Sequence, residues 1–467
     1  MTLRSHRIVV VGAGPAGVRA AETFARFDVR PIVVDESARD GGQIYRRQPD
    51  GFTRDAEALY GSEAEKARAL HRTFESLRDR IDYRPSTLAW NATANALHVV
   101  RGEAADSIAF DALLICSGAT DRLLPLRGWN LAGCYTLGAA QIALKAQACA
   151  IGSRVAFAGT GPLLYLVASQ YMKAGADVAA VIDTSRATPS LAALRGLLAR
   201  PSVLIRGMGL VRSLKRAGVR VLQGATPLSI EGSSPDGVRA IVVRDASGGE
   251  SRIECTAVAL GYHLRPEAQL ADIAHCAFAF DQTTRQWLPR TDSDGRSSID
   301  GIYLAGDGAR VLGADAAEAS GRLAALAALK DLGHGDGAHA FDAEAPALRR
   351  TLATMLAFRN GLATMFRWPH QQAASIPDDA VVCRCEVITA GELRRATELE
   401  AHEINRAKAF SRVGMGRCQG RYCGEAAAEI VAACTNVPIE SVGRLRAQAP
   451  VRPLSFGTQE APSGTGR

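Results

Sequence analysis

Residues 7–36 decide the fold of the first part of the chain and read RIVVVGAGPAGVRAAETFARFDVRPIVVDE. A short β-branched run at 8–11 meets a glycine-rich turn, and a helical stretch follows at 18–26. A second β-branched run at 32–34 then ends in Asp35. Short apolar runs on both sides of a helical pattern predict two parallel strands joined by a helix. The stretch therefore predicts an α/β domain with a parallel sheet.

The turn between the first strand and the helix has three glycines with separate roles. Gly12 permits the tight turn, Gly14 lets the backbone approach a pyrophosphate, and Gly17 lets helix and strand pack closely. The N-terminus of the helix offers free N–H groups to the phosphates. Asp35 can accept hydrogen bonds from ribose hydroxyls, and we prefer it to the neighbouring Glu36 because Asp35 lies at the end of the strand. The pattern predicts a dinucleotide site.

A weaker copy of this pattern occupies residues 154–183, RVAFAGTGPLLYLVASQYMKAGADVAAVID. Gly159 and Gly161 lie in the turn and Asp183 ends the second strand, but Leu164 stands where a glycine or alanine is expected. A leucine there pushes helix and strand apart or fills the cofactor groove. We expect a vestigial or repurposed dinucleotide fold, and binding of NAD(P) or another nucleotide stays open.

Three later stretches decide between FAD and NAD(P) for the first domain. They are DGGQIYRR at 40–47, DALLICSGATDRLLPLRG at 111–128 and GIYLAGDGARVLGADAAEASGR at 301–322. In order and spacing they resemble the motifs of flavoproteins that have two dinucleotide-binding domains, one inserted into the other. The resemblance implies that the first domain binds FAD. The redox-active cysteine pair of the disulfide reductases is missing, so flavin electrons must leave by another route.

The same resemblance gives single residues their roles. Asp307, which follows Gly306, would accept hydrogen bonds from the ribityl hydroxyls of FAD. The start of the next helix, near Ala316, would face the isoalloxazine ring. The remaining expected contacts lie beside the flavin and near its adenine half: Gly42, Gln43 and Gly118.

Four of the ten cysteines cluster towards the C-terminus. Cys383 and Cys385 stand one residue apart, and Cys418 and Cys423 follow in the glycine-rich stretch GMGRCQGRYCGEA. Four thiolates suit a zinc ion or an iron–sulfur cluster, but structural zinc sites mostly use pairs separated by two residues. The segment resembles the small helical [2Fe-2S] domain of bacterioferritin-associated ferredoxins. We predict one [2Fe-2S] cluster held by all four cysteines, with zinc or free thiols as alternatives.

The composition fits a soluble protein of two or three domains, with 467 residues, 47% hydrophobic and 22% charged, and a net charge of +7. The arginines are scattered, which argues against nucleic-acid binding. We find no secretion signal and no apolar run that would span a membrane, so we expect a cytoplasmic protein, with weak peripheral contact to an anionic membrane left open. Six cysteines are expected to be small buried hydrophobes: Cys116, Cys134, Cys149, Cys255, Cys276 and Cys434.

We expect an α/β fold in which one Rossmann-like domain is inserted into another and a small helical [2Fe-2S] domain follows. The expected units are an FAD domain at 1–140 and 275–340, an inserted NAD(P)-binding-like domain at 145–270, a bridging segment at 341–377, a [2Fe-2S] domain at 378–440 and a tail at 441–467 with a disordered end.

Apart from its tail, the whole chain resembles the larger FAD/[2Fe-2S] subunit of bacterial amine-oxidising dehydrogenase complexes. Opine oxidases, D-hydroxyproline dehydrogenases and hydrogen cyanide synthases belong to this group. The resemblance is carried by the cysteine pattern and by stretches such as GGQIYRRQPDGFTRDAEALYG, GCYTLGAAQIALK and ALGYHLRPEAQLA. It implies a partner flavoprotein resembling D-amino acid oxidase, which holds the amine site, and in some complexes a small ferredoxin-like protein.

On this interpretation the chain serves in oxidation of the C–N bond of an amino acid or secondary amine, of opine, D-hydroxyproline or glycine type. No paired arginines that would bind a substrate carboxylate stand out, so the catalytic residues are unknown. Two alternatives remain. The chain could be an NAD(P)H-dependent ferredoxin-type reductase, or a non-catalytic nucleotide-binding scaffold for a partner flavoprotein.

Overall fold

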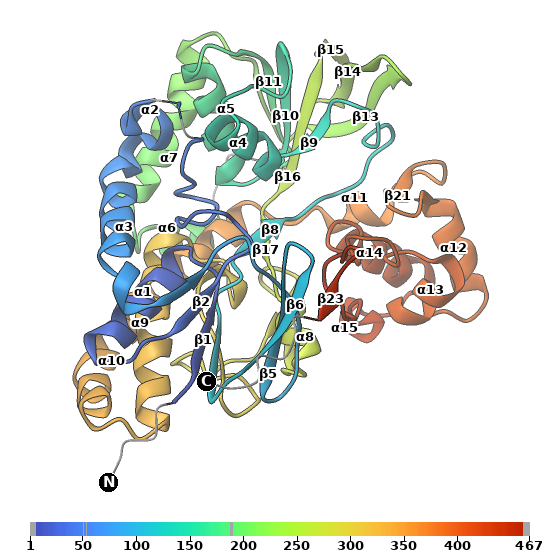
Figure 1. Ribbon diagram of the computed structural model, residues 1–467. Coiled ribbons are helices and arrows are strands. Elements are labelled where there is room, and N and C mark those ends of the chain that lie inside the picture. Colours follow the sequence, from blue (N-terminus) through green and yellow to red (C-terminus); the bar gives the residue numbers. More distant parts are fainter. Residues whose placement is uncertain (1–5, 50, 53, 187–189, 461–467) are drawn as a thin grey trace.

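The computed structural model describes residues 6–49, 51–52, 54–186 and 190–460, and Figure 1 shows how their elements are arranged. The first unit is built on a five-stranded parallel sheet with the order β20-β7-β1-β2-β3. Its central strands are almost fully buried because helices cover the sheet, as continuous apolar strands require. The strands are β1 (Ile8–Val11), β2 (Ile32–Val34), β3 (Asp82–Arg84), β7 (Ala112–Ile115) and β20 (Ile302–Leu304).

Two helices of the first unit, α1 (Pro15–Arg26) and α9 (Ala314–Asp331), pack against each other very closely. Gly321 allows this approach, because a Cβ at Gly321 would overlap the backbone of Ala16. Helix α3 (Ala64–Ser76) lies beside α1 and follows α2 (Ala56–Tyr60). Single 3-10 turns complete the unit: η1 (Gly61–Glu63), η2 (Arg78–Arg80) and η3 (Gly306–Gly308).

The second unit has its own five-stranded parallel sheet, in the order β12-β11-β10-β16-β9. Strand β9 pairs with β16, so the chain joins this sheet from Cys134 on, earlier than the expected boundary at residue 140. The elements are β9 (Cys134–Thr136), α4 (Leu137–Ala146), β10 (Arg154–Thr160), α5 (Pro162–Lys173), β11 (Asp177–Asp183), α6 (Leu191–Leu197), α7 (Pro201–Arg216), β12 (Val221–Gln223) and β16 (Ala257–Tyr262), with an antiparallel sheet of β13 (Thr226–Ser233), β14 (Gly237–Arg244) and β15 (Glu250–Glu254).

Two antiparallel strands connect the units, since the chain leaves the first unit through β8 (Ala119–Asp121) and returns through β17 (Leu264–Pro266). Short elements follow the return: α8 (Gln269–Ile273), β18 (Phe278–Asp281) and β19 (Gln286–Pro289). A small sheet of β4 (Leu88–Ala92), β5 (Ala96–Arg101) and β6 (Ala104–Ala109) is extended by β23 (Gln459–Glu460) of the tail. Residues 461–467, for which the sequence predicts disorder, lie outside the described residues.

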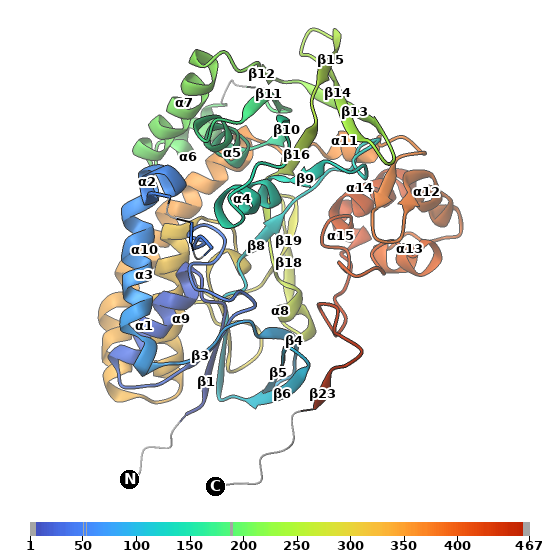
Figure 2. The same ribbon diagram turned by 45° about the horizontal axis from the view of Figure 1, so that its top comes forward.

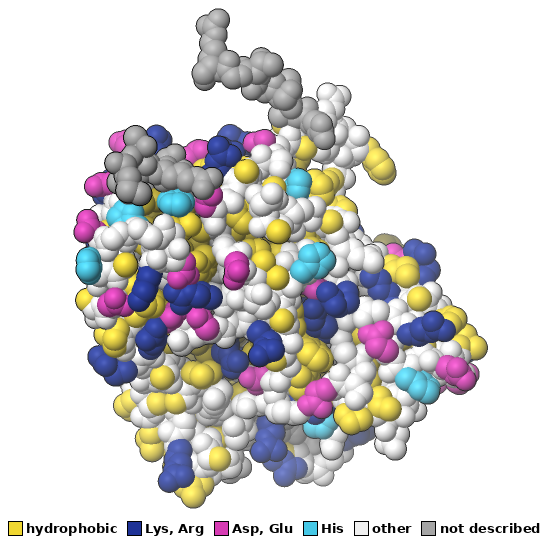
Figure 3. Space-filling view, turned by 90° about the horizontal axis from the view of Figure 1, so that it is seen from below, with side chains coloured by type: hydrophobic (Ala, Val, Ile, Leu, Met, Phe, Trp, Pro, Cys, Tyr) yellow, Lys and Arg dark blue, Asp and Glu magenta, His cyan; other side chains and the backbone are white. Residues whose placement is uncertain are grey.

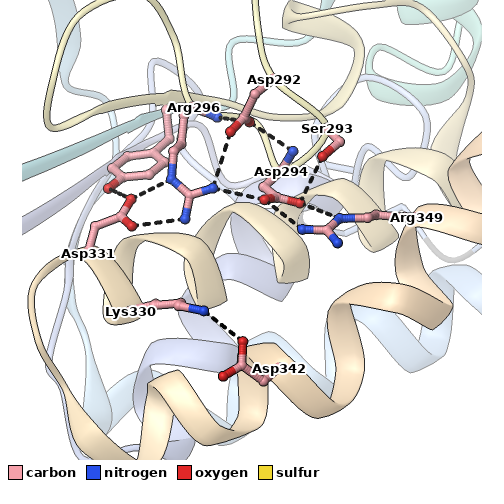
Figure 4. A network of polar contacts seen from close by, with 9 residues as sticks. Asp292, Ser293, Asp294, Arg296, Lys330, Asp331, Asp342 and Arg349 are labelled. Atoms are coloured by element: carbon pink, nitrogen blue, oxygen red, sulfur yellow. Dashed lines mark hydrogen bonds and ion pairs between the residues drawn. The ribbon is translucent and has the colours of Figure 1, made fainter.

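Helix α10 (Gly335–Met365) contacts α9 of the first unit and α6 of the second, so it bridges the two (Figure 2). A polar network fastens it to the first unit (Figure 4). Asp294 accepts hydrogen bonds from Arg349 of α10, at 2.7 and 2.8 Å, and from Arg296, at 2.8 Å. Arg296 also donates to both oxygens of Asp331, at 2.6 and 2.9 Å.

The C-terminal unit is small and mainly helical, and lies beside β8 and β17 (Figure 1). Its buried residues form their own apolar cluster, which includes Val382, Ile404 and Ile430. On the face shown in Figure 3, Lys and Arg side chains are interspersed with Asp and Glu. The elements of this unit are α11 (His370–Ala374), β21 (Val381–Cys383), β22 (Ile388–Thr389), α12 (Ala390–Glu398), α13 (Ile404–Ser411), α14 (Gly424–Thr435) and α15 (Ile439–Val442).

Candidate functional site

A cavity of about 970 Å³ lies between the two nucleotide-type units and has the size of a cofactor site. It is lined by residues from β1, β2, β8, α2, α4, α5 and the start of α9. Eight of the nine residues predicted to bind FAD line it: Gly12, Gly14, Asp35, Gly42, Gln43, Gly118, Gly306 and Asp307. The ninth, Gly17, lies behind the wall, where a Cβ would overlap the carbonyl oxygen of Gly12.

The glycine turn fits a phosphate-bearing ligand. Gly12 has φ +103°, and a Cβ there would overlap the carbonyl oxygen of Cys116, so both the turn and the packing require glycine. At Gly14 a Cβ would meet only Gly42, at an ordinary 3.5 Å. Protein packing therefore does not require Gly14, and the space before it is free for a ligand. No side chain caps α1, so the N–H groups of its first turn remain for phosphates.

The first of the two acidic residues expected to bind FAD is held by backbone groups. Asp35 is 8% exposed, and its oxygens accept from the backbone N–H of Ala13, at 2.5 Å, and of Ser37, at 2.6 Å. Burial raises the pKa of Asp35, and these two hydrogen bonds only partly offset it. Glu36 lines the same cavity, so the structure leaves both acids in reach of a ribose.

The second acid, Asp307, has one oxygen bound and one free. Its Oδ1 accepts from the backbone N–H of Leu312, at 2.9 Å, and of Gly313, at 3.0 Å, while Oδ2 has no hydrogen bond to a described residue. The free oxygen of a fixed carboxylate on the cavity wall suits a ligand hydroxyl. The following helix begins at Ala314, and Ala316 is buried in the core, so the helix start that faces the cavity is Gly313 and Ala314 rather than Ala316.

The four clustered cysteines lie together as two pairs. The thiol of Cys383 lies within hydrogen-bonding reach of Cys423, and that of Cys385 within reach of Cys418. Within the part of the chain that the structure describes, no three His, Cys, Asp or Glu side chains converge on one metal position. Cys385 and Cys418 also act on the pKa of Cys423, so all four sulfurs lie near one another, as the four-thiolate ligand set of a two-iron cluster requires.

The surroundings of the pairs favour the thiolate at Cys383. Contact with the Cys423 thiol, together with backbone N–H groups of Gly414, Glu386 and Cys385, lowers the pKa of Cys383 to about 6. Backbone N–H groups of Gly420 and Tyr422 also approach Cys418, but burial and the neighbouring Cys385 raise its pKa. Contact with Cys383 together with burial raises the pKa of Cys423. A thiolate is the form that binds iron, and N–H groups aimed at sulfur tune a cluster's potential.

Three glycines let the chain close around these sulfurs. Gly414 and Gly420 have φ +77° and +76°, and a Cβ on either would lie 2.6 or 2.5 Å from Cδ1 of Leu445. A Cβ on Gly416 would overlap that of Cys385. These three glycines of GMGRCQGRYCG are therefore needed for the packing of the cysteine loop.

Comparison with known proteins gives two family matches along the chain. The family model of the pyridine nucleotide-disulphide oxidoreductases matches residues 6–322, and that of the BFD-like [2Fe-2S] binding domain matches residues 381–433. The chain belongs to the pyridine nucleotide-disulphide oxidoreductase family. The oxidoreductase therefore has FAD and a [2Fe-2S] cluster as its cofactors, as the glycine turn and the four thiols predict.

The relatives of the oxidoreductase are components of larger enzymes. An opine oxidase subunit of Rhizobium meliloti is 36% identical over 96% of this chain and 86% of its own. The corresponding opine oxidase subunit of Agrobacterium tumefaciens is 38% identical over 96% and 90%. Hydrogen cyanide synthase subunit HcnB of Pseudomonas protegens is 29% identical over 96% of both chains. The predicted resemblance to this group is confirmed.

Among solved structures, L-proline dehydrogenase from P. horikoshii is similar with a TM-score of 0.69 and 18% identity, over 98% of this chain and 79% of that one. This likeness shows the fold, and it confirms the predicted α/β flavoprotein architecture with an added helical domain. In the described part of the oxidoreductase, no helix has both the length and the apolar character to cross a membrane.

The second nucleotide-type fold holds its predicted ligands differently. Asp183 is fully buried, and accepts from Thr160 Oγ1, at 3.0 Å, from Tyr165 Oη, at 2.6 Å, and from Ser185 N, at 2.9 Å. It thus has no exposed oxygen for a ribose, contrary to the role that its sequence position suggests. Gly159 is required by packing, since a Cβ would overlap Gly261 of the neighbouring strand.

The groove at the start of α5 is filled by the protein itself. Leu164 is fully buried and packs with Phe157 and Phe366 in one apolar cluster. A Cβ on Gly161 would lie 2.9 Å from Nδ1 of His263, whose Nε2 donates to the carbonyl oxygen of Phe366 at 2.5 Å. Burial lowers the pKa of His263 to about 3, so the ring that covers the groove is neutral.

Several site residues are not predicted by the sequence patterns. Arg421 and Tyr422 line the FAD cavity, although they stand between the cluster cysteines Cys418 and Cys423. The side chain of Arg421 is 3% exposed and bonds with Glu267 of the first unit. Their position in sequence, between two expected cluster ligands, was the signal that could have identified them as site residues. A buried lysine, Lys145, also lines the cavity, and its signal is a lone charge in the apolar run AAQIALKA.

The six other cysteines divide into two groups. Four are buried as expected: Cys116, Cys134, Cys255 and Cys276. Cys149 and Cys434 are exposed, which corrects the expectation for these two. Cys149 follows the end of α4 in a surface loop, and Cys434 lies in the last turn of α14, so the apolar neighbours of each in sequence are not its neighbours in space.

Proposed function

We propose that the chain is the FAD/[2Fe-2S] subunit of a complex that oxidises the C–N bond of an amino acid or secondary amine. The substrate class is of opine, D-hydroxyproline or glycine type, and electrons pass between flavin and cluster to an acceptor outside the chain. The named relatives, which are subunits of opine oxidase and hydrogen cyanide synthase, support this class of reaction. The proposed partners are a D-amino-acid-oxidase-like flavoprotein and a small ferredoxin-like protein.

One observation carries the electron-transfer part of the proposal. The loop that contains Cys418 and Cys423 also supplies Arg421 and Tyr422 to the wall of the cavity that contains Asp307. The cluster ligands and the flavin cavity are thus separated by little more than the loop itself. FAD supplies two-electron chemistry when bound, and a one-electron cluster beside it gives those electrons an exit.

We propose the residue roles as follows. The first unit holds FAD and is made of residues 1–140 and 275–340, without the strand β9 and the start of α4 but with the segment 267–274 that follows β17. Residues 378–440 hold the cluster through Cys383, Cys385, Cys418 and Cys423. The FAD contacts are Gly12, Gly14, Asp35, Gly42, Gln43, Gly118, Gly306 and Asp307, with Gly17 supporting the turn.

The filled groove of the second nucleotide-type fold disfavours the alternative of an NAD(P)H-dependent reductase. A nicotinamide dinucleotide would need a ribose acceptor and a free helix N-terminus, and here Asp183 is buried and His263 lies against Gly161. We therefore assign this fold a structural role, with its helices α4 and α5 closing the FAD cavity.

Anaerobic reduction of the purified protein tests the proposal. The chain alone should keep its flavin absorbance when NADH, NADPH or a free amine is added. Together with its D-amino-acid-oxidase-like partner, the flavin should bleach when the matching opine, hydroxyproline or glycine is added. Rapid bleaching by NADH would instead support a reductase, and robust amine turnover by the chain alone would contradict the division of labour.

A further inference from the structure

Lys145 is a buried cation on the wall of the FAD cavity. It lies on α4, is 4% exposed, and lines the cavity. Its Nζ donates to the carbonyl oxygen of Ile44 at 3.2 Å and lies 5.6 Å from the centre of the Tyr60 ring. The side chain therefore reaches from the second unit to the segment Gly42–Tyr45 of the first (Figure 2 shows α4 between the units).

Lys145 has no carboxylate partner. Among the described residues, no Asp or Glu oxygen lies within 4.0 Å of its Nζ, whereas the partly exposed Lys66 has Glu63 at 3.0 Å and Asp315 at 2.6 Å. Burial of an ammonium group without a counter-ion is costly, and proteins normally pair such a group. Burial lowers the pKa of Lys145 to about 8, so most of it is still protonated at neutral pH.

Carboxylates such as Glu57 and Glu63 also line the cavity, but none of the described ones forms an ion pair with Lys145, and its own helix adds a neutral amide. Gln141 of α4 and Gln170 of α5 both line the cavity, and Gln141 Nε2 donates to Gln170 Oε1 at 3.1 Å. The amide nitrogen of Gln170 is left as a further donor in the same cavity. The ammonium group of Lys145 is thus free to pair with an anion, and such an anion would come with the occupant of the cavity.

The diphosphate of FAD already has a matched site. The uncapped start of α1 and the free space before Gly14 are built for it. Lys145 instead contacts the carbonyl of Ile44, next to Gly42 and Gln43, which are expected beside the flavin ring. A flavin ring gains negative charge at its N1 and C2 carbonyl side on reduction, and a nearby protein charge sets how readily it does so.

We propose that Lys145 is the positive charge of an anion subsite that receives the negative charge of the reduced flavin ring, and so raises the flavin's reduction potential. Lys145 acts only through its positive charge, and it transfers no proton or electron itself. A carboxylate of a small molecule bound in the same cavity has the same chemistry and is the rival occupant.

The experiment uses the full FAD-loaded chain and the variants Lys145→Met, Lys145→Gln and Lys145→Arg. Lys173→Met is the matched control, because Lys173 lines the same cavity but is exposed, and water screens its charge. Circular dichroism and the flavin-to-protein ratio check that each variant is folded and loaded. Sulfite is the probe, since its sulfur adds to N5 of the oxidised ring and the electron pair leaves a negative charge on the N1 side.

We expect Lys145→Met and Lys145→Gln to bind sulfite at least about tenfold more weakly than the wild type, and their flavin midpoint potential to fall. Lys145→Arg and Lys173→Met should stay within about threefold. Equal sulfite affinity and potential in Lys145→Met would overturn the proposal. A second result would also overturn it: Lys145→Met binds sulfite as the wild type does, but its flavin spectrum no longer responds to benzoate. The charge of Lys145 would then bind a carboxylate ligand.

This inference rests on the FAD assignment, and the two can fail separately. A wild-type protein that carries no flavin would overturn both. A flavin-loaded protein whose properties are indifferent to Lys145 would overturn the inference alone. Bleaching by NADH, which would contradict the proposed function, leaves the sulfite measurement valid.

Discussion

Arg421 fastens the cysteine loop to the first unit, and Arg421→Met is predicted to loosen that attachment. Its guanidinium donates to both oxygens of Glu267, at 2.7 and 3.1 Å, and to the carbonyl of Val451, at 2.8 Å. Burial alone would raise the pKa of Glu267, but the charge of Arg421 outweighs it and the pKa is lowered. Methionine keeps much of the side chain's volume and removes the ion-pair partner of Glu267, which then has only the more distant charges of Arg452 and Arg265.

The cost can be estimated from the burial of the pair. Removing one partner of a buried ion pair costs about 3–5 kcal/mol. The side chains of Arg421 and Glu267 are 3% and 14% exposed, so some water reaches the carboxylate, and we expect a value near the lower end, about 3 kcal/mol. The double variant Arg421→Met with Glu267→Gln has no unpaired charge and should recover about 1–2 kcal/mol of this loss.

Urea titration of the FAD- and cluster-loaded protein measures the effect, with cluster absorbance and flavin fluorescence followed separately. The cluster transition of Arg421→Met should move to lower urea by more than the flavin transition. Arg417→Met is the control, because Arg417 is exposed in the same loop, and it should change the free energy of unfolding by less than about 0.5 kcal/mol. If Arg421→Met and Arg417→Met have the same cluster midpoint, the ion pair does not hold the loop.

Three further predictions concern single side chains. Asp307→Ala should lose most of its FAD on gel filtration, because a hydrogen-bond acceptor on the cavity wall that the cofactor covers is worth about 1–3 kcal/mol, and full flavin occupancy would show that Asp307 has another role. Cys418→Ser should lose the paramagnetic resonance signal of the reduced cluster but keep FAD, whereas the exposed Cys434→Ser should keep both; one zinc per wild-type chain would contradict the cluster. Burial alone would raise the pKa of Asp272. The hydrogen bonds from Arg444 outweigh burial, so the net result is a pKa lower than the ordinary 3.8. Its carboxylate therefore stabilises the fold at higher pH, and the stability gap to Asp272→Asn should shrink as pH falls below that value; a gap that is constant with pH would refute this.

The sequence alone determined the features that are local along the chain. The run from Ile8 to Asp35 predicts strand, glycine turn, helix and strand, because each step depends on residues a few positions apart. The four cysteines predict a cluster because ligand type and spacing are also local properties. Both predictions need no knowledge of how distant segments meet, and the family match agrees with them.

Only the tertiary structure decided what these local units face. Asp183 has the sequence position of a ribose acceptor, yet its buried partners Thr160 and Tyr165 use its oxygens. The place of Arg421 and Lys145 on one cavity wall depends on the contact of three units, which no local pattern encodes. Whether a polar group meets a ligand, a partner or water is fixed by packing between segments far apart in sequence, because burial and pairing set its energy.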